Sequence, residues 1–345
     1  MKNQTSKMEK AKKDQHGKGL DVGTSFIHSA EKKGEEVTFK TQRDAFFDLE
    51  NNDFTRKMLE KSKINFVEKG GGLYVLGDEA VEFANIFNRE VRRPLAKGVI
   101  SPQEKEALPV VELLIKSVLG EPKEKGGILC YSVPSRPLDA DFLVVYHKKV
   151  LERYLRSLGF APKAIEEGLA VILSELPEEK FTGIGVSFGG GMTNMCLAYL
   201  ASPVVSFSVI RAGDWIDQQV AMAVGETAAR VCALKEGKLN LGRQQGLSKV
   251  EEALSIYYDH LIEYVLVNFK RELEGMRNIP DFRKQIPIVL SGGTTLPKGF
   301  LERFEKTLSE IHFPIEIGEV RMATQPLYTV AKGALVAAMA EEEKE

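Results

Sequence analysis

The alternation of apolar and small residues predicts two strand–turn–strand units that lie about one domain apart in the chain. In the later unit, residues 183–186 have the pattern of an incoming strand, 189–191 of a tight glycine turn and 192–200 of an outgoing strand. The earlier unit runs through residues 18–30 and turns at 23–25. Successive glycines add no side chain to a core, but they let backbone N–H groups closely approach a bound group, commonly a phosphate. The pattern therefore predicts two hairpins that clamp a phosphate from two sides.

The rest of the pattern predicts further strands and helices. Apolar residues at helical spacing predict helices over 52–62, 78–87, 103–119, 138–158, 164–176, 215–224, 226–235, 248–273, 300–311 and 326–340. Strands are expected within 37–47 and over 64–67, 73–76, 127–133, 204–210, 286–290 and 315–317. Glycines 70–72, which charged residues flank, are expected to form only the loop of a small hairpin. The two halves of the chain look like rough copies, because each opens with a strand–glycine turn–strand unit.

Length and charge narrow the function classes. A chain of 345 residues suits two domains of medium size. The net charge of −2 argues against a general nucleic-acid binder, because phosphate contacts need a surplus of basic side chains. No apolar run reaches the roughly 20 residues that cross a membrane. The polar, mostly basic residues 1–17 are expected to be a disordered tail, with weak attraction to an anionic surface as the alternative.

The cysteines and histidines give no sign of a disulfide framework or a zinc site. Cys130, Cys196 and Cys232 lie far apart in apolar surroundings, so we expect buried free thiols in a reducing compartment and hence a cytoplasmic protein. The five histidines are scattered, and no pair has the spacing of metal ligands.

Asp21 and a later glycine pair suggest nucleotide chemistry. Asp is uncommon inside strands, so Asp21, just before the first glycine turn, is expected to hold Mg²⁺ through water beside a phosphate. The alternative is an Asx turn that satisfies local N–H groups. The predicted strand at 286–290 is followed by Ser-Gly-Gly-Thr-Thr and a helix, which suits a nucleotide lying against the backbone. Two hairpin turns and this third turn predict a nucleoside di- or triphosphate in a cleft between domains.

The motifs in this order resemble the actin superfamily. LDVGTS and VSFGGGMTN are similar to its two phosphate loops, and LSGGTTLPKG to its adenosine loop. AIEEGLAV and TVAKGAL look like the two helices that connect the domains, and LKEGKL like the pair that contacts adenine and ribose. YVLGDEA and RRPLAKGVI resemble stretches of the bacterial actins MreB and MamK. The resemblance runs from about residue 18 to 340 and implies an α/β, actin-like fold of two duplicated, ribonuclease H-like domains.

The resemblance also implies a domain plan. Domain I would cover residues 18–165, with a small insertion subdomain at about 48–92. Domain II would cover 166–332, and residues 333–345 would return to domain I as a C-terminal helix with an acidic end. Between Lys235-Glu236 and the helix expected at 248, only residues 237–246 are available for the subdomain that closes over the nucleotide in MreB-like proteins. A reduced subdomain at about 215–247 is therefore expected, with changed filament contacts on that side.

The implied ligands are ATP or ADP with Mg²⁺, which Asp21 would hold through water. Glu167 matches the glutamate that orients the attacking water in bacterial actins. The resemblance implies nucleotide contacts at Asp21, Gly23, Thr24, Ser25, Gly189, Gly190, Gly191, Met192, Thr193, Gly213, Lys235, Glu236, Gly292, Gly293, Thr294 and Leu296. The chain departs from the usual second phosphate loop at two positions, where Ser187 and Asn194 replace acidic residues. Since a hydroxyl cannot supply a carboxylate's charge, we expect retained binding with weak or slow ATP hydrolysis.

The function implied is an actin-like cytoskeletal protein that assembles with itself into nucleotide-dependent filaments. The alternative is a non-polymerising ATP-binding scaffold or adaptor of the same fold, and a small-molecule phosphotransferase is less expected. Further partners would be membrane- or organelle-associated proteins, and no nucleic-acid partner is expected.

Overall fold

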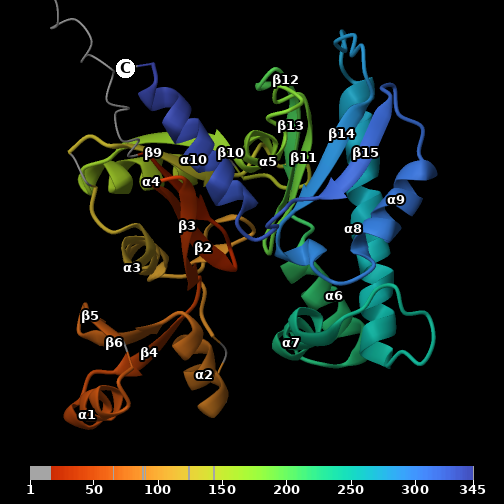
Figure 1. Ribbon diagram of the computed structural model, residues 1–345. Coiled ribbons are helices and arrows are strands. Elements are labelled where there is room, and N and C mark those ends of the chain that lie inside the picture. The colour runs from red at the N-terminus through yellow and green to blue at the C-terminus, as the bar shows by residue number, and fades with distance from the viewer. Residues whose placement is uncertain are drawn as a thin grey trace, which may run out of the picture.

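The computed structural model describes residues 17–64, 66–87, 89, 91–122, 125–142 and 144–344. The predicted disordered tail at 1–17 lies outside the described residues, apart from Gly17. The described chain forms two α/β lobes side by side, and a small subdomain extends from the first lobe (Figure 1). Within the described residues, none of the helices is both long and apolar enough to span a membrane.

The first lobe is built on a mixed sheet with the strand order β10-β9-β1-β2-β3. Its strands are β1 (Lys18–Val22), β2 (Phe26–Lys33), β3 (Glu36–Arg43), β9 (Ile128–Val133) and β10 (Ala161–Glu166). β1 and β2 form the predicted first hairpin, whereas β9 and β10 run parallel to β1. Helices α3 (Ala107–Leu119) and α4 (Val145–Ser157) pack on this sheet, with Leu114, Leu129 and Leu151 in the shared core.

The second lobe repeats the same topology, with the strand order β13-β12-β11-β14-β15. Its strands are β11 (Gly183–Phe188), β12 (Thr193–Tyr199), β13 (Ser202–Val209), β14 (Ile286–Ser291) and β15 (Ile317–Met322). β11 and β12 form the second glycine hairpin, and β14 and β15 run parallel to β11. The identical order of antiparallel and parallel neighbours confirms that the two halves are structural copies.

Helices on the second lobe cover its sheet and extend away from it. They are α6 (Gly213–Val224), α7 (Ala228–Lys238), α8 (Lys249–Glu274), the short 3₁₀ helix η1 (Gly293–Thr295) and α9 (Phe300–Ser309). Ser248 begins α8 with a capping box, because its hydroxyl accepts from the Glu251 N–H and the Glu251 carboxylate accepts from the Ser248 N–H. Buried residues such as Leu261, Phe269 and Phe304 join α8 and α9 in one core.

A small subdomain interrupts the first lobe after β3. It contains β4 (Phe46–Glu50), α1 (Asp53–Lys61), β5 (Phe66–Lys69), β6 (Gly72–Leu76) and α2 (Asp78–Ile86). The sheet order β4-β6-β5 buries a separate core that includes Phe47, Leu59 and Leu73. The chain then returns through a short hairpin of β7 (Leu95–Ala96) and β8 (Val99–Ile100).

Two helices join the lobes. α5 (Glu167–Glu175) packs on β11 and β12, and α10 (Thr329–Glu342) packs on β1, β9 and α5. Both junctions depend on missing side chains. A Cβ at Gly333 would lie 1.8 Å from the Ala170 carbonyl oxygen, and a Cβ at Gly19 would lie 2.1 Å from the Ala331 carbonyl oxygen. Glycine is therefore required where these helices approach each other and the first sheet so closely.

The structure corrects several predicted boundaries. Residues 164–166 end strand β10 and are not helical, because they pair in parallel with β9. The helix expected from 138 begins only at Val145, since the Leu138 N–H donates to the Ser208 carbonyl and ties this segment to β13 instead. The strand expected at 315–317 is Ile317–Met322, where pairing with β14 decides its position. Cys130 and Cys196 are buried free thiols as predicted, whereas Cys232 is partly exposed.

Candidate functional site

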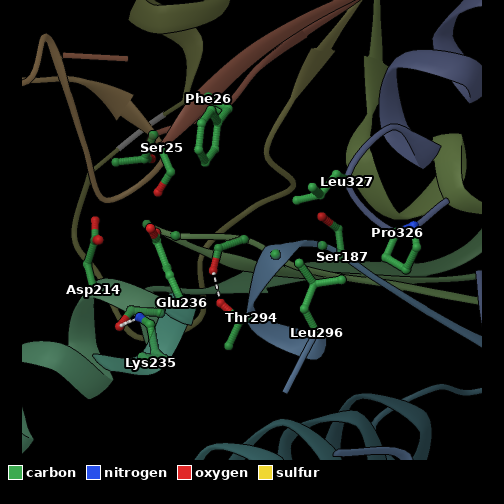
Figure 2. A pocket seen from close by; sticks show the side chains of 18 of the residues that line it. Ser25, Phe26, Ser187, Asp214, Lys235, Glu236, Thr294, Leu296, Pro326 and Leu327 are labelled. Carbon is green, nitrogen blue, oxygen red and sulfur yellow. Dashed lines mark hydrogen bonds between the residues drawn. The ribbon is translucent and has the colours of Figure 1, made fainter. Parts of the chain in front are cut away.

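A cleft of about 680 Å³ lies between the two lobes. Its walls include both glycine hairpins, the start of α5, helices α6 and α7, and the β14–α9 turn that contains η1. Figure 2 shows Ser25 and Phe26 on one side of this cleft, with Lys235, Glu236 and Thr294 on the opposite side. The cleft therefore brings together parts of the chain that lie more than 250 residues apart.

In the second glycine turn, the carbonyl oxygens of Gly189 and Gly190 accept hydrogen bonds from other segments. The Gly189 carbonyl accepts from the Gly213 N–H at 3.1 Å and from the Thr294 hydroxyl at 2.8 Å, and the Gly190 carbonyl accepts from the Asp214 N–H at 2.8 Å. Within the described residues, no backbone hydrogen bond is made by the N–H groups of Gly190 and Gly191. A turn with paired carbonyls and unpaired amides suits an anion.

The two hairpin turns also touch each other. A Cβ at Gly190 would lie 2.2 Å from the Ser25 Oγ, and a Cβ at Gly191 would lie 2.3 Å from the Thr24 Oγ1. Thr24 in turn accepts from the Gly98 N–H at 3.1 Å, which ties the β7–β8 turn to the first loop. The glycines are therefore required for close approach of the two lobes.

The other glycine triplet behaves differently. Gly70 and Gly71 have φ values of +60° and +83° in the β5–β6 turn, and nothing lies within 4 Å of a Cβ added at either position. This confirms the prediction of a plain hairpin loop, where glycine is needed for its backbone conformation rather than for an approaching group.

Two carboxyl groups lie in the cleft, that of Asp21 near the C-terminal end of β1 and that of Glu167 at the start of α5. The Ser132 hydroxyl donates to Asp21 Oδ1 at 2.7 Å, and the Ser187 hydroxyl donates to Glu167 Oε2 at 3.0 Å. Removal from water raises the pKa of Asp21 to about 6, which the Ser132 hydrogen bond opposes. Removal from water, together with the charge of Asp21, raises the pKa of Glu167 to about 8. Burial and mutual repulsion thus disfavour two negative charges on this pair, and Glu167 is largely protonated at neutral pH until a cation lies nearby.

Asn194 and Glu166 belong to a polar cluster just behind this pair. The Asn194 Oδ1 accepts from the Ser135 N–H at 3.0 Å, and Glu166 accepts from the hydroxyls of Ser135, at 3.1 Å, and Ser206. The segment after β9 is thereby fixed to β12 and β13. This cluster positions the wall of the cleft.

One end of the cleft, beside Gly213 at the start of α6, is lined by side chains. Lys235 on α7 donates to the Gly213 carbonyl at 2.9 Å and to Asp217 Oδ2 at 2.7 Å. Glu236 faces Arg43 of the first lobe at 3.7 Å. Leu296, in the β14–α9 turn, is half exposed into the cleft and supplies an apolar surface. This end combines apolar area with charged groups, as a site for a nucleoside requires.

Comparison with protein families identifies the chain. A sequence model described as Volactin matches residues 17–338. The chain belongs to the Volactin family. A comparison with curated protein sequences gives no match.

Several solved structures that are similar to this Volactin-family chain share its actin-like fold. The MamK double helical filament has a TM-score of 0.72 and 20% identity, over 93% of this chain and 98% of that chain. MreB5 of Spiroplasma citri bound to AMPPNP has a TM-score of 0.69 and 15% identity, over 95% and 97%. The ethanolamine utilization protein EutJ from Carboxydothermus hydrogenoformans has a TM-score of 0.55 and 14% identity, over 92% and 88%.

The Volactin-family structure brings most of the predicted site residues to one cleft. The residues that line it are Asp21, Gly23, Thr24, Ser25, Glu167, Gly189, Gly190, Gly191, Met192, Gly213, Lys235, Glu236, Gly292, Gly293, Thr294 and Leu296. Thr193 does not line the cleft, because it begins β12 and its hydroxyl donates to the Arg211 carbonyl at 2.9 Å.

Several residues that line the cleft were missed by sequence reasoning. Asp217, Tyr258, Asn240 and Lys298 line it but were not predicted. Asp217 carried a usable signal, since it lies one helical turn after Asp214 in a helix that starts at the cleft. Tyr258 had none, because its spacing on α8 is that of an ordinary core residue.

Proposed function

We propose that this Volactin-family protein binds an adenine nucleotide with Mg²⁺ in the interlobe cleft, hydrolyses ATP slowly and assembles into nucleotide-dependent filaments. One observation carries the proposal. Two glycine turns from duplicated halves meet in the lining of a single cleft, and the N–H groups of Gly190 and Gly191 in the second turn make no backbone hydrogen bond within the described residues. Backbone amides of this kind bind phosphate without a specific side chain.

The structural neighbours support both parts of the proposal. One neighbour is described as a double helical filament of MamK, and S. citri MreB5 is described as bound to AMPPNP in one structure and to ADP in another. The shared fold makes the same ligand class and the same self-association reasonable for this chain. A cytoplasmic location and organelle- or membrane-associated partners remain predictions.

The carboxyl pair fits a divalent cation. Among the described residues, no group of three or more His, Cys, Asp or Glu side chains could hold a metal ion by itself. Asp21 would therefore hold Mg²⁺ through water together with phosphate oxygens, which is the usual arrangement for this ion. Mg²⁺, when bound, supplies the positive charge that the phosphates and the Asp21–Glu167 pair require. Ser132 would keep the Asp21 carboxylate in place.

Slow hydrolysis follows from the groups around Glu167. This carboxylate would orient the attacking water, and phosphoryl transfer depends mainly on such positioning and on charge stabilisation. Its partner Ser187 contributes a hydroxyl but no charge, and Asn194 is held by the Ser135 N–H. The cleft therefore contains fewer carboxylates than the usual second phosphate loop would provide.

The non-polymerising scaffold is the second candidate, and one observation favours it. Between α7 and α8 the chain has only residues 239–248. A protein with so little structure above the nucleotide would lack contacts that a larger subdomain could offer to a neighbouring subunit.

Titration calorimetry with MgATP and MgADP tests the binding proposal. We expect the wild-type protein to bind both, and Gly191→Val to weaken binding about tenfold or more, which is about 1.4 kcal/mol or more. The added side chain would meet Thr24 and the Gly98 N–H at the phosphate turn. Gly71→Asn is the matched control, since Asn tolerates positive φ and the site is open. Absence of binding by the wild-type protein would refute the proposal.

A further inference from the structure

The segment 239–242 lies between α7 and α8, where a reduced subdomain was expected in place of the larger one of MreB-like proteins. Leu239 and Asn240 line the cleft, and Leu241 is buried in the core of the second lobe. This short segment therefore forms part of the cleft wall, beside the β14–α9 turn that carries Leu296.

The β14–α9 turn fixes the segment from one side. The Leu241 N–H donates to the Lys298 carbonyl at 2.7 Å, and Asn240 forms an isolated parallel bridge with Lys298. Gly299 has a φ of +88°, and a Cβ there would lie 2.3 Å from the Gly242 nitrogen. The Asn240 side chain also accepts from the Gly242 N–H at 3.0 Å, which closes the turn locally.

Arg303 on α9 holds the segment through hydrogen bonds to its backbone. Its Nε and Nη2 donate to the Leu241 carbonyl at 3.0 and 2.7 Å. Its Nη1 donates to the Ser255 carbonyl at 3.2 Å and to both Asp259 oxygens at 2.8 Å. One guanidinium thus joins the segment to α8 and α9. Only a planar fork of several donors can make this set of bonds, so a lysine cannot replace it.

Two buried polar atoms in the lining of the same cleft have no hydrogen-bond partner among the described residues. These are Asp217 Oδ1 and the Tyr258 hydroxyl. Asp217 is 3% exposed and Tyr258 is 0% exposed, and both line the cleft. An unpaired buried polar atom costs about 1–3 kcal/mol. Polar edges of a ligand, or water that the ligand retains, would offset this cost.

We propose that segment 239–242 forms one wall of a base subsite and that Arg303, which does not line the cleft, is the positioning residue that holds this wall. The inference rests on the proposed nucleotide function. The glycine turns serve the phosphate end, whereas this wall with Asp217 and Tyr258 serves the heterocyclic end. The short segment would thereby close over the base in place of the larger subdomain of MreB-like proteins.

The test compares Arg303→Gln and Arg303→Lys with the wild-type protein and with a control variant, Arg230→Gln. Arg230 is an exposed arginine of α7 that forms an ion pair with Glu226, four residues earlier in the chain. Calorimetry gives the Kd for MgADP. Hydrogen exchange at saturating MgADP follows peptides that cover 237–246 and 187–194. We expect both Arg303 variants to bind MgADP about tenfold more weakly, or about 1.4 kcal/mol. In these variants, ligand-induced protection of 237–246 is lost while that of 187–194 is kept.

Several results would overturn the inference. Wild-type affinity in Arg303→Gln would do so, and so would an equal loss of protection in both peptides, since that indicates general destabilisation. A weakening of the same size in Arg230→Gln would also contradict it. Failure of the wild-type protein to bind MgADP at all would instead refute the proposed function, and the inference with it.

Discussion

At the scale of single residues, serine hydroxyls take positions around the two carboxyl groups of the cleft. Ser132 donates to Asp21, and Ser187 donates to Glu167. Each hydroxyl satisfies one carboxylate oxygen without adding charge. The site consequently has fewer carboxylates than a site with an acidic residue at position 187 would have. We expect weak attraction for Mg²⁺ and slow turnover to have the same origin in the serine at position 187.

Ser187→Asp should reverse this balance. Without metal, a third carboxylate beside Glu167 is expected to lower the free energy of unfolding by about 2 kcal/mol, because like charges are then buried together. With MgATP, it should raise phosphate release about tenfold or more, as added charge at the metal stabilises the transition state. Denaturant unfolding in a chelator and phosphate-release kinetics measure the two effects.

Ser187→Ala is the control, since it removes the hydroxyl without adding charge and should not raise turnover. Equal turnover in wild type and Ser187→Asp would show that the missing carboxylate does not limit hydrolysis.

The sequence was sufficient to predict the candidate site residues that act through their backbone groups. The turn at 189–191 could be predicted because three consecutive residues without side chains have few structural explanations. Asp217 and Tyr258 were not found, since their role depends on burial and on partners that come from other elements. Arg303 was hidden for the same reason, because its contact with Leu241 joins residues 62 positions apart.

At the scale of elements, the β7–β8 hairpin connects the first glycine turn to helix α4. The Gly98 N–H donates to Thr24, and the Ile100 N–H donates to His147 Nδ1 at 3.2 Å. His147 is almost fully buried, and burial lowers its pKa from the ordinary 6.5 to about 4. The imidazole must be neutral at Nδ1 to accept this hydrogen bond. Protonation would therefore release the hairpin from α4.

His147 should make the protein acid-sensitive. Its pKa is lower in the folded state, so the unfolded state binds more protons between about pH 4 and 6.5, and stability falls as the pH decreases through this window. From about pH 7 to about pH 5 this one group should cost about 2 kcal/mol. His147→Gln can still accept from the Ile100 N–H but does not titrate, so it should lose less stability over the same range.

Denaturant unfolding of both proteins at the two pH values, in a chelator, measures the difference. His28, whose pKa burial also lowers to about 4, titrates in both proteins and cancels in the comparison. An identical pH dependence in wild type and variant would contradict the prediction.

The predicted elements failed where pairing partners decided the outcome. Residues 161–166 contain helix formers such as Ala164 and Glu166, yet parallel pairing with β9 makes them a strand. Residues 138–142 lie before α4 and not in it, because the Leu138 N–H and the Asp139 carboxylate are used by β13 and Ile210. Local periodicity cannot reveal a contact made some 70 residues later. The glycine hairpins, in contrast, are local and were predicted.

At the scale of the whole molecule, small contacts hold the two lobes at a set distance. α5 and α10 cross at Gly333, and ion pairs Arg93–Asp214 at 2.9 Å and Arg43–Glu236 at 3.7 Å bridge the cleft. Both pairs are partly exposed to solvent, and exposed ion pairs contribute only about 0–1 kcal/mol each. Nucleotide phosphates that touch both glycine turns would therefore have more influence on the lobe arrangement than these pairs do. A filament that requires nucleotide is consistent with this balance.

The β12–β13 turn gives the filament proposal a sharp test at one end of the molecule, opposite α1 and α7 (Figure 1). Leu200 and Ala201 have φ values of +49° and +62°, and Leu200 is 53% exposed. A leucine at positive φ, facing solvent, is unfavourable in an isolated subunit. Contact with a second subunit would offset that cost.

Sedimentation and microscopy with MgATP, MgADP and a non-hydrolysable analogue decide the question. We expect wild-type filaments only with nucleotide. Leu200→Asn should be as stable as wild type or slightly more stable, by a few tenths of a kcal/mol, because Asn tolerates positive φ. It should nevertheless pellet less, because an apolar contact is lost. A variant that folds better and assembles worse cannot be explained by misfolding. Monodisperse wild-type protein with every nucleotide would favour the scaffold, and equal pelleting of both proteins would exclude this turn from the contact.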